Sequence, residues 1–372
     1  MQWMVPKERL DATQTRILNE FHEFPEYFYV SGNPGTGKSV LLVHFVREVK
    51  LAHPEMKICV LTFTHALRKV LEDGIRMSDV EVMTFSRFDT VFKRKKRQFD
   101  LIVVDEVQDM QHPWANTIQG NAPKVLFFGD FGQSLYEDTV TESTFTAQFQ
   151  PTRRNLDYIH RLPPTIRDLV NSLFPGSPIR AHVSNLAGDS QIRLFHAETA
   201  EDEFSFLERE APGYASNGSP TGILFRHRKD LRAFLSSFGQ GIPVKRTERN
   251  TDYDAINAWF RKKGKPFRFL GNEYGDLSEC DEQSIVFVMT WHSSKGLDFE
   301  TVFLPRISGE VDQTVPFYVA LTRARLNLIL SCSGEDDSLV HRIKIFPGTI
   351  AGEVSDIFSP SQEGIGSGEW PF

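Results

Sequence analysis

Short apolar runs recur along the chain and alternate with segments in which apolar residues have a helical period. Runs of this kind suit buried β-strands, and the periodic segments suit helices that cover a sheet. Their alternation is typical of an α/β protein with mainly parallel sheets. In the first half of the chain the expected strands are Tyr27–Val30, Ile58–Thr62, Val80–Thr84, Leu101–Val104 and Val125–Phe128. In the second half they are Ile192–His196, Gly222–Phe225, Ile285–Thr290, Val302–Leu304 and Leu328–Ser331.

Two sets of strands within 372 residues predict two stacked α/β lobes. The boundary is expected near Phe149-Gln150-Pro151, which gives lobes at 1–150 and 151–350. The last segment, 351–372, is rich in Gly, Ser and Glu and is expected to be a disordered tail.

The composition narrows the class of protein without identifying it. Hydrophobic residues make up 40% and charged residues 24%, and no apolar run is long enough to predict a membrane span. Three cysteines lie far apart, so neither a disulfide framework nor a zinc site is expected, and a cytoplasmic location is predicted. The net charge of −7 argues against bulk attraction to nucleic acid but leaves room for a locally basic groove. One basic run, Lys93–Arg97, could hold phosphates, although such runs are usually solvated surface.

The stretch Gly32-Asn33-Pro34-Gly35-Thr36-Gly37-Lys38-Ser39 joins an expected strand to an expected helix. It fits the pattern G-x-x-x-x-G-K-[ST], in which glycines let backbone N–H groups turn toward a phosphate. Lys38 would neutralise the β- and γ-phosphate oxygens, and the Ser39 hydroxyl would bind Mg²⁺. A Gly-rich turn without a ligand is the alternative, but the strand–loop–helix context favours nucleotide binding.

An acidic pair, Asp105-Glu106, follows the apolar run Leu101–Val104. Phosphoryl transfer needs a carboxylate on Mg²⁺ and a group that orients or deprotonates water, so Asp105 and Glu106 could divide these roles. Acidic residues that cap a helix are the structural alternative. A glutamate at this point implies hydrolysis, because a small-molecule kinase gains nothing from activating water.

Further segments follow the phosphate loop and DEVQD in a fixed order. They are VLTFTHALRKVL (Val60–Leu71), VMTFSRF (Val82–Phe88), FGDFGQSLY (Phe128–Tyr136), HRLPPTI (His160–Ile166), TWHSSKGLDF (Thr290–Phe299) and FYVALTRAR (Phe317–Arg325). In residues and in order this set resembles the UvrD/Rep-like branch of superfamily 1 DNA helicases. The resemblance implies two RecA-like P-loop NTPase lobes with ATP and Mg²⁺ between them.

The resemblance also implies roles for single residues. Gln14 would read the adenine edge, Gln133 would sense the γ-phosphate, and Arg161 and Arg323 would stabilise charge on the transferred phosphoryl group. The implied catalytic residues are Lys38, Glu106, Gln133, Arg161 and Arg323, and the implied metal ligands are Ser39 and Asp105. The implied nucleotide-binding residues are Gln14, Gly32, Asn33, Pro34, Gly35, Thr36, Gly37, Lys38, Ser39, Val40, Gly296 and Asp298.

A nucleic-acid path across both lobes is implied as well. Its expected contacts are Phe63, Thr64, His65, Thr84, Ser86, Tyr136, His292 and Ser293. Aromatic side chains can stack on bases without sequence preference. A core position for Phe63 and a buried, hydrogen-bonded role for His292 are the alternatives.

The chain departs from the family pattern in residues and in size. Val40 and His160 stand where the family often has Arg and Tyr around the adenine, and Asp298 stands where it usually has Glu. The large accessory domains of the relatives are replaced by short gaps, Asp89–Phe99 and about Lys245–Ser284.

The expected function is therefore an ATP-dependent translocase or helicase on single-stranded DNA, with 3′→5′ movement favoured. A nucleotide-dependent switch that gates a partner protein and an RNA-directed ATPase remain open. The end of the chain, Gly366–Phe372, resembles the docking tip of bacterial single-stranded-DNA-binding proteins, so Trp370 and Phe372 could bind a partner. An unstructured end is the alternative.

Overall fold

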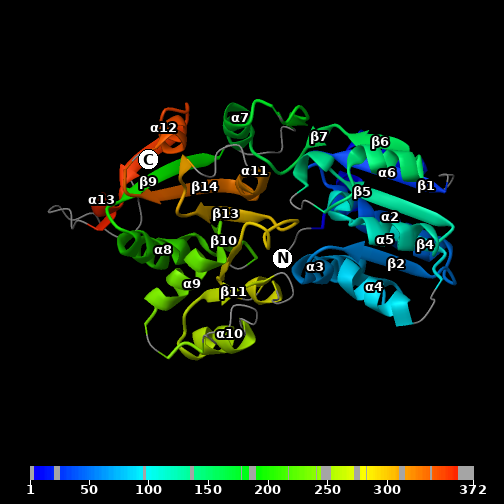
Figure 1. Cartoon of the computed structure of the whole chain (residues 1–372), viewed down its shortest axis with the longest axis horizontal. Coiled ribbons are helices and arrows are strands. Elements are labelled where there is room, and N and C mark those ends of the chain that lie inside the picture. Colours follow the sequence, from blue (N-terminus) through cyan, green and yellow to red (C-terminus); the bar gives the residue numbers. More distant parts are fainter. Residues whose placement is uncertain are drawn as a thin grey trace.

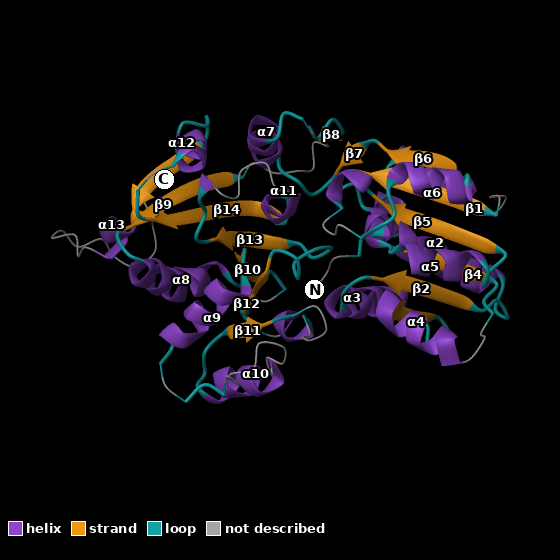
Figure 2. Ribbon diagram, viewed as in Figure 1, coloured by secondary structure: helices purple, strands orange, loops and turns teal. Residues whose placement is uncertain are grey.

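The structure, a computed structural model, describes residues 4–20, 26–94, 98–134, 138–176, 178–183, 190–216, 218–239, 241–243, 253–271, 277–281, 283–309, 315–335 and 337–358. It consists of two α/β lobes that lie next to each other, each a sheet with helices on both faces (Figures 1 and 2). The expected fold class, two RecA-like lobes with mainly parallel sheets, is confirmed.

The first lobe contains a six-stranded parallel sheet in the order β3-β2-β4-β5-β1-β6. The strands are β1 (Tyr27–Gly32), β2 (Ile58–Thr62), β3 (Glu81–Thr84), β4 (Leu101–Val104), β5 (Lys124–Gly129) and β6 (Thr152–Leu156). The helices are α1 (Ala12–Glu20), α2 (Lys38–Ala52), α3 (His65–Ile75), α4 (Phe85–Arg94), α5 (His112–Gln119) and α6 (Glu142–Phe149).

The second lobe contains a seven-stranded parallel sheet in the order β11-β12-β10-β13-β14-β9-β15. The strands are β9 (Gln191–Ala197), β10 (Thr221–Phe225), β11 (Phe267–Phe269), β12 (Val286–Thr290), β13 (Phe299–Leu304), β14 (Ala324–Ser333) and β15 (Thr349–Glu353). The helices are α7 (Pro164–Leu173), α8 (Ala200–Tyr214), α9 (Arg228–Ser237), α10 (Tyr253–Lys262), α11 (Val315–Leu321), α12 (Ser338–Lys344) and α13 (Val354–Phe358). A small pair, β7 (Tyr158–Ile159) and β8 (His182–Val183), lies between the sheets in sequence.

Apolar strand residues fill a core layer on each face of the first sheet. Phe28 and Val30 of β1 pack with helices α1, α2 and α3, whereas Tyr29 points to the other face and packs with α4, α5 and α6. Successive strand side chains alternate between faces, so a strand buried on both sides must be apolar throughout. This explains why the central strands are recognisable as continuous apolar runs.

The strand order brings the phosphate loop close to the acidic pair. Strand β5 lies between β1 and β4, and all three are parallel. Their carboxyl ends therefore meet at one edge of the sheet, the edge where ligands bind in α/β proteins. In Figure 1 this edge of the first lobe faces the second lobe.

Each expected strand is present, but the polar and very short strands were missed. Strand β6 has the sequence TRRNL and pairs with β1, so the first sheet extends past the boundary expected near residue 150. Strand β15 forms the other sheet's edge and is mostly exposed, and β11 has only three residues. Edge strands need no continuous apolar run, because one side of the strand is open to solvent.

The disordered tail expected at 351–372 is wrong for its first part: residues 351–358 form the end of β15 and α13, because β15 pairs with β9 and Val354 packs in the core. Three predictions lie outside the described residues: Tyr136 as a nucleic-acid contact, the side chains of the basic run Lys93–Arg97, and the end of the chain with Trp370 and Phe372. No described helix has the length and apolar character needed to cross a membrane.

Candidate functional site

The phosphate loop connects β1 to α2 and depends on its glycines. Gly35 and Gly37 have φ angles of 78° and 82°, in the left-handed region that favours glycine. A Cβ on Gly37 would lie 2.5 Å from Gln14 Nε2. The loop leads directly into α2, whose first residue is Lys38, so the positive end of the helix dipole faces the loop.

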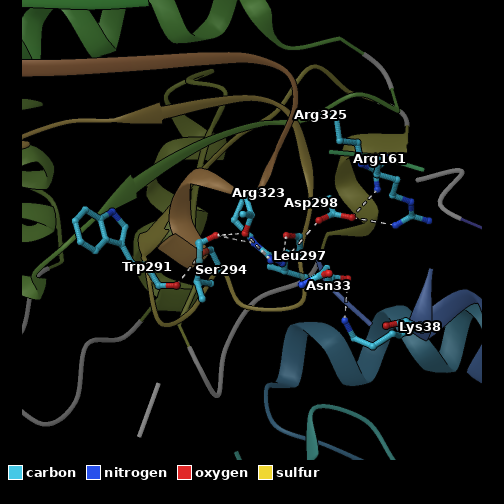
Figure 3. Close-up of polar contacts among 12 residues, drawn as sticks. Asn33, Lys38, Arg161, Trp291, Ser294, Leu297, Asp298, Arg323 and Arg325 are labelled. Atoms are coloured by element: carbon cyan, nitrogen blue, oxygen red, sulfur yellow. Dashed lines mark hydrogen bonds and ion pairs between the residues drawn. The ribbon is translucent and has the colours of Figure 1, made fainter. Parts of the chain in front are cut away.

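Lys38 crosses back over the loop. Its ammonium donates to the carbonyl of Gly32 at 2.6 Å and to that of Asn33 at 3.3 Å, the latter contact drawn in Figure 3. Both acceptors are neutral, so the charge of Lys38 is available to a phosphate.

Ser39 and Asp105 form a donor set that suits a divalent cation. The Ser39 hydroxyl donates to Asp105 Oδ2 at 3.2 Å, and the Asp105 side chain is fully buried. Burial and the neighbouring Glu106 carboxylate both raise the pKa of Asp105. A hydroxyl and a carboxylate oxygen are the ligands that Mg²⁺ takes beside nucleotide phosphates, and the ion would offset the charge of two adjacent buried acids. The residues present therefore fit Mg²⁺.

Glu106 has an unusual backbone and a cationic environment. Its φ is 57°, and its Oε2 accepts from Gln108 Nε2 at 2.5 Å. Burial alone would raise the pKa of Glu106, but the charges of Lys295, Lys38 and Arg323 hold it below its usual value. The carboxylate is therefore ionised and can accept a proton. A non-glycine residue at positive φ costs about 1–3 kcal/mol and is often found at functional sites.

The second lobe contributes arginines around one acid. Asp298 Oδ2 accepts from Arg161 Nη1 at 2.9 Å and from Arg325 Nη2 at 3.2 Å, and Arg323 Nη1 lies 3.7 Å from Oδ1 (Figure 3). Burial raises the pKa of Asp298, but the charges of Arg325, Arg161 and Arg323 outweigh this and lower it to about 2. Arg323 is also held by the carbonyls of Val319 and Leu297.

The two groups of residues line one cavity between the lobes. Its expected members are Pro34, Gly35, Gly37, Lys38, Ser39, Val40, Glu106, Gln133, Arg161, Gly296, Asp298 and Arg323. Its other members are Leu67, Val70, Leu277, Leu297 and Arg325. Of the remaining expected residues, Asp105 lies behind Ser39, while Gly32, Asn33 and Thr36 belong to the loop backbone.

Gln14 and His160 lie against the phosphate loop. Gln14 Nε2 donates to the Thr36 carbonyl at 3.0 Å, and its Oε1 accepts from the Asp11 amide at 3.0 Å. His160 Nε2 lies 2.7 Å from the Asp11 carboxylate, and its backbone N–H donates to the Gly35 carbonyl. The donor and the acceptor of the Gln14 side-chain amide are therefore both hydrogen-bonded within the chain. To bind adenine, Gln14 would have to break these hydrogen bonds and form new ones with the base.

A second, open groove on the first lobe brings together four of the eight expected nucleic-acid contacts, Phe63, His65, Thr84 and Ser86. We call it the aromatic groove; it is lined by Phe63, His65, Thr84, Phe85, Ser86, Arg87, Thr90, Val91 and Trp114. The Phe85 and Trp114 rings are parallel, with an interplanar angle of 2° and centroids 4.9 Å apart. Phe63 is half-buried and packs on the core as well as lining the groove. Aromatic rings, hydroxyls and an arginine together suit an unpaired nucleotide.

Other expected contacts have structural partners. The Thr64 hydroxyl accepts from the Leu67 amide and caps α3, and the Ser293 hydroxyl lies 3.0 Å from that of Thr290. Burial, Lys295, Arg228 and His227 lower the pKa of His292, so its imidazole lies in a cationic part of the second lobe.

Sequence reasoning missed Trp114, Arg325 and Lys295. Trp114 follows DEVQD within HPWAN, so it lies just outside one motif, whereas Arg325 is the last residue of the motif FYVALTRAR. Lys295 is 2% exposed and donates to Asp109 Oδ1 at 2.8 Å and to the Gln133 carbonyl at 2.7 Å, which links the lobes. The residues around Lys295 in the sequence did not indicate this pairing, because Asp109 is 186 residues away.

Comparison with known proteins adds two family matches. Residues 15–139 match the AAA domain family, and residues 270–335 match the UvrD-like helicase C-terminal domain family. No curated protein sequence matches the chain.

Three of the matching solved structures are of proteins described as helicases. Arterivirus nonstructural protein 10 (helicase) has 15% sequence identity and a TM-score of 0.45, and the match covers 86% of this chain and 62% of that one. The PRRSV helicase has 13% sequence identity and a TM-score of 0.45, and the match covers 82% of this chain and 52% of that one. The structure of Arterivirus nonstructural protein 10 (helicase) with DNA has 15% sequence identity and a TM-score of 0.44, and the match covers 86% of this chain and 63% of that one. The chain thus spans less than two thirds of the length of each of these proteins.

The AAA match contains the phosphate loop and the acidic pair, and the UvrD-like match contains Gly296, Asp298 and Arg323. The first lobe therefore carries an AAA domain, and the second lobe carries a UvrD-like helicase C-terminal domain.

Proposed function

We propose that the chain hydrolyses ATP in the cavity between its lobes and uses the cycle to move along single-stranded DNA, with 3′→5′ polarity. The observation that carries the proposal is the composition of the cavity. Lys38, Ser39 and Glu106 of the first lobe face Arg161, Arg323 and Gly296 of the second across it. A triphosphate bound there would contact both lobes and favour a closed cleft.

The proposed roles follow from the chemistry of each side chain. Lys38 binds β- and γ-phosphate oxygens, and Ser39 with Asp105 would hold Mg²⁺, which supplies further charge neutralisation when bound. Glu106 orients the attacking water and accepts its proton, which its ionised state allows. Gln133 contacts the γ-phosphate, and Arg161 and Arg323 stabilise the charge that develops in the transition state. Gln14 binds the adenine edge.

The proposed nucleic-acid path includes the aromatic groove and the surface around His292. Phe63 and Trp114 offer rings for bases, and Arg87 offers a charge for a phosphate. Stacking and backbone contacts of this kind are sequence-tolerant and suit a motor that moves along any strand. Gln133 lines the cavity between the lobes, and its carbonyl accepts a hydrogen bond from Lys295. Lys295 stands two residues after Ser293 in the chain, so the proposed nucleotide site lies close to this part of the proposed nucleic-acid path.

The test is ATPase turnover measured with no polymer, with single-stranded DNA and with RNA of the same sequence. Stimulation by DNA is the expected result. Turnover that ignores both polymers would favour a nucleotide-dependent switch that gates a partner, and stimulation by RNA alone would favour an RNA-directed ATPase. Polarity is read from movement on strands labelled at each end, and 5′→3′ movement would contradict the proposal.

The location of the protein is a separate proposal. Cys59, Cys280 and Cys332 are buried free thiols, which supports a reducing compartment such as the cytoplasm.

A further inference from the structure

One acid and three arginines of the cavity, Asp298 with Arg161, Arg323 and Arg325, form a cluster with an excess of positive charge. We call it the Asp298 cluster. With the arginines protonated and Asp298 ionised, its net charge is +2. Such an excess in a partly buried place is stabilised by an added anion.

The three arginines of the Asp298 cluster differ in their hydrogen-bond partners. Arg323 is fixed by backbone carbonyls of its own lobe, whereas Arg161 reaches Asp298 from a segment 137 residues earlier in the chain. Arg325 contacts the same oxygen of Asp298 from β14, and its Nε is buried without a hydrogen-bond partner among the described residues. Asp298 thus binds Arg161 inside the cavity, and Arg325 beside it has a buried Nε that donates to no described acceptor.

We propose that Asp298 is a positioning residue that holds Arg161 in the cavity in the place of a phosphate, and that Arg325 anchors Asp298 when Arg161 turns to the triphosphate. This rests on the proposed function, because it assumes that a triphosphate binds in the cavity. The carboxylate competes with phosphate for the same guanidinium, so it lowers affinity for nucleotide and prevents Arg161 from pairing with a wrong anion. A residue that instead bound the ribose would raise affinity.

The experiment uses the affinity of the full chain for ADP and for the non-hydrolysable analogue AMP-PNP, with Mg²⁺. Asp298→Asn is expected to bind AMP-PNP about tenfold more tightly, the equivalent of about 1.4 kcal/mol. Asp298→Glu keeps the charge and is expected to stay near the wild-type value. Arg167→Gln on α7 removes a guanidinium that pairs with Asp168 outside the cavity, so it is the matched control and should change nothing.

The double variant Asp298→Asn/Arg325→Gln distinguishes two explanations: competition between the Asp298 carboxylate and phosphate for Arg161, and an effect of the cluster's net charge alone. Its cluster has the same net charge of +2 as the wild type, so a purely electrostatic effect predicts wild-type affinity. Competition predicts that it still binds AMP-PNP several-fold more tightly, since the carboxylate that competes with phosphate for Arg161 is gone. It also serves if Asp298→Asn alone fails to fold, which a thermal melt would reveal.

Two outcomes overturn the inference: weaker binding by Asp298→Asn, which would make Asp298 a nucleotide ligand, or wild-type affinity of the double variant. The proposed function has its own control in Lys38→Ala. If wild type and Lys38→Ala bind AMP-PNP equally, the nucleotide site itself is misplaced. If Lys38→Ala abolishes binding while the Asp298 variants behave as the wild type, only the role of Asp298 is wrong.

Discussion

Glu106 and Lys38 line the same cavity, yet they would act at different stages of the reaction. Glu106 accepts a hydrogen bond from Gln108, nearby cations hold the pKa of its carboxyl below the usual value, and in the proposed function it takes a proton from water. We expect Glu106→Gln to reduce turnover at least about 10²-fold while nucleotide affinity is largely kept, because only the base is lost. Steady-state ATPase rates and direct nucleotide binding measure the two quantities. A variant that retains most of its turnover would remove Glu106 from catalysis.

Lys38→Ala gives the contrasting result. The Lys38 ammonium donates to two neutral carbonyls of the loop, and in the proposed function its charge would serve the phosphates in both the ground state and the transition state. We expect both nucleotide affinity and turnover to fall. Because Lys38 is half-buried at the surface of the loop, a thermal melt should stay close to the wild type. A large loss of thermal stability would mean that the residue holds the loop together instead.

At the scale of elements, α5 supplies a ring to the aromatic groove. Trp114 stacks on the buried Phe85 at the start of α4 and lines the groove with Phe63. We expect Trp114→Ala to weaken single-stranded DNA binding by about 1–3 kcal/mol, with similar losses for different sequences. Fluorescence titration at fixed salt measures the affinity.

Trp259 provides the control for this prediction. It is also half-buried, but it lies on α10 in the second lobe, where Lys263 lies over its ring. Trp259→Ala should leave DNA affinity unchanged. If both tryptophan variants lose affinity equally, the effect of Trp114 is one of stability and the groove is not the DNA site.

At the scale of the whole molecule, a buried ion pair joins the lobes. Lys295 and Asp109 are 2.7 Å apart, with exposed side-chain fractions of 2% and 0%. Removing one partner leaves a buried charge unpaired, which typically costs about 3–5 kcal/mol. We therefore expect Lys295→Met and Asp109→Leu each to lower the melting temperature strongly.

The double variant Lys295→Met/Asp109→Leu should recover stability, because two apolar side chains can replace a buried pair at little cost. It should not recover stimulation of ATPase by DNA, since the link between the acidic pair's segment and the second lobe is lost. Full recovery of both would show that the pair is only structural.

The small size of the second gap also leads to a prediction about duplex unwinding. In the resembling helicases, duplex engagement is attributed to large accessory domains. Here the described part of the second gap contains α10 and β11, and β11 joins the sheet. Base-pair steps cost about 1.4 kcal/mol each, so energy from ATP is sufficient and geometry is limiting. We expect translocation with weak unwinding by the purified chain. Efficient opening of a long blunt-ended duplex would contradict this.

The sequence by itself determined the features that depend on short stretches of chain. Strands β2 and β4 are apolar throughout because both their faces are buried, and this leaves a continuous run in the sequence. The loop from Gly32 to Ser39 is recognisable because close backbone approach and positive φ require glycine at fixed places. The acidic pair Asp105-Glu106 is recognisable because it directly follows the apolar run of β4.

Only the tertiary structure decided which distant side chains meet. Nothing in the segments around Asp298 indicated that its carboxylate would hold Arg161 and Arg325, nor did HPWAN indicate that Trp114 would stack on Phe85. The edge strand β6 was equally hidden, because hydrogen bonds to β1 form it and four of its five side chains are polar. Local patterns record burial and backbone geometry, whereas these contacts arise from the packing of elements far apart in the chain, which no short window of sequence contains.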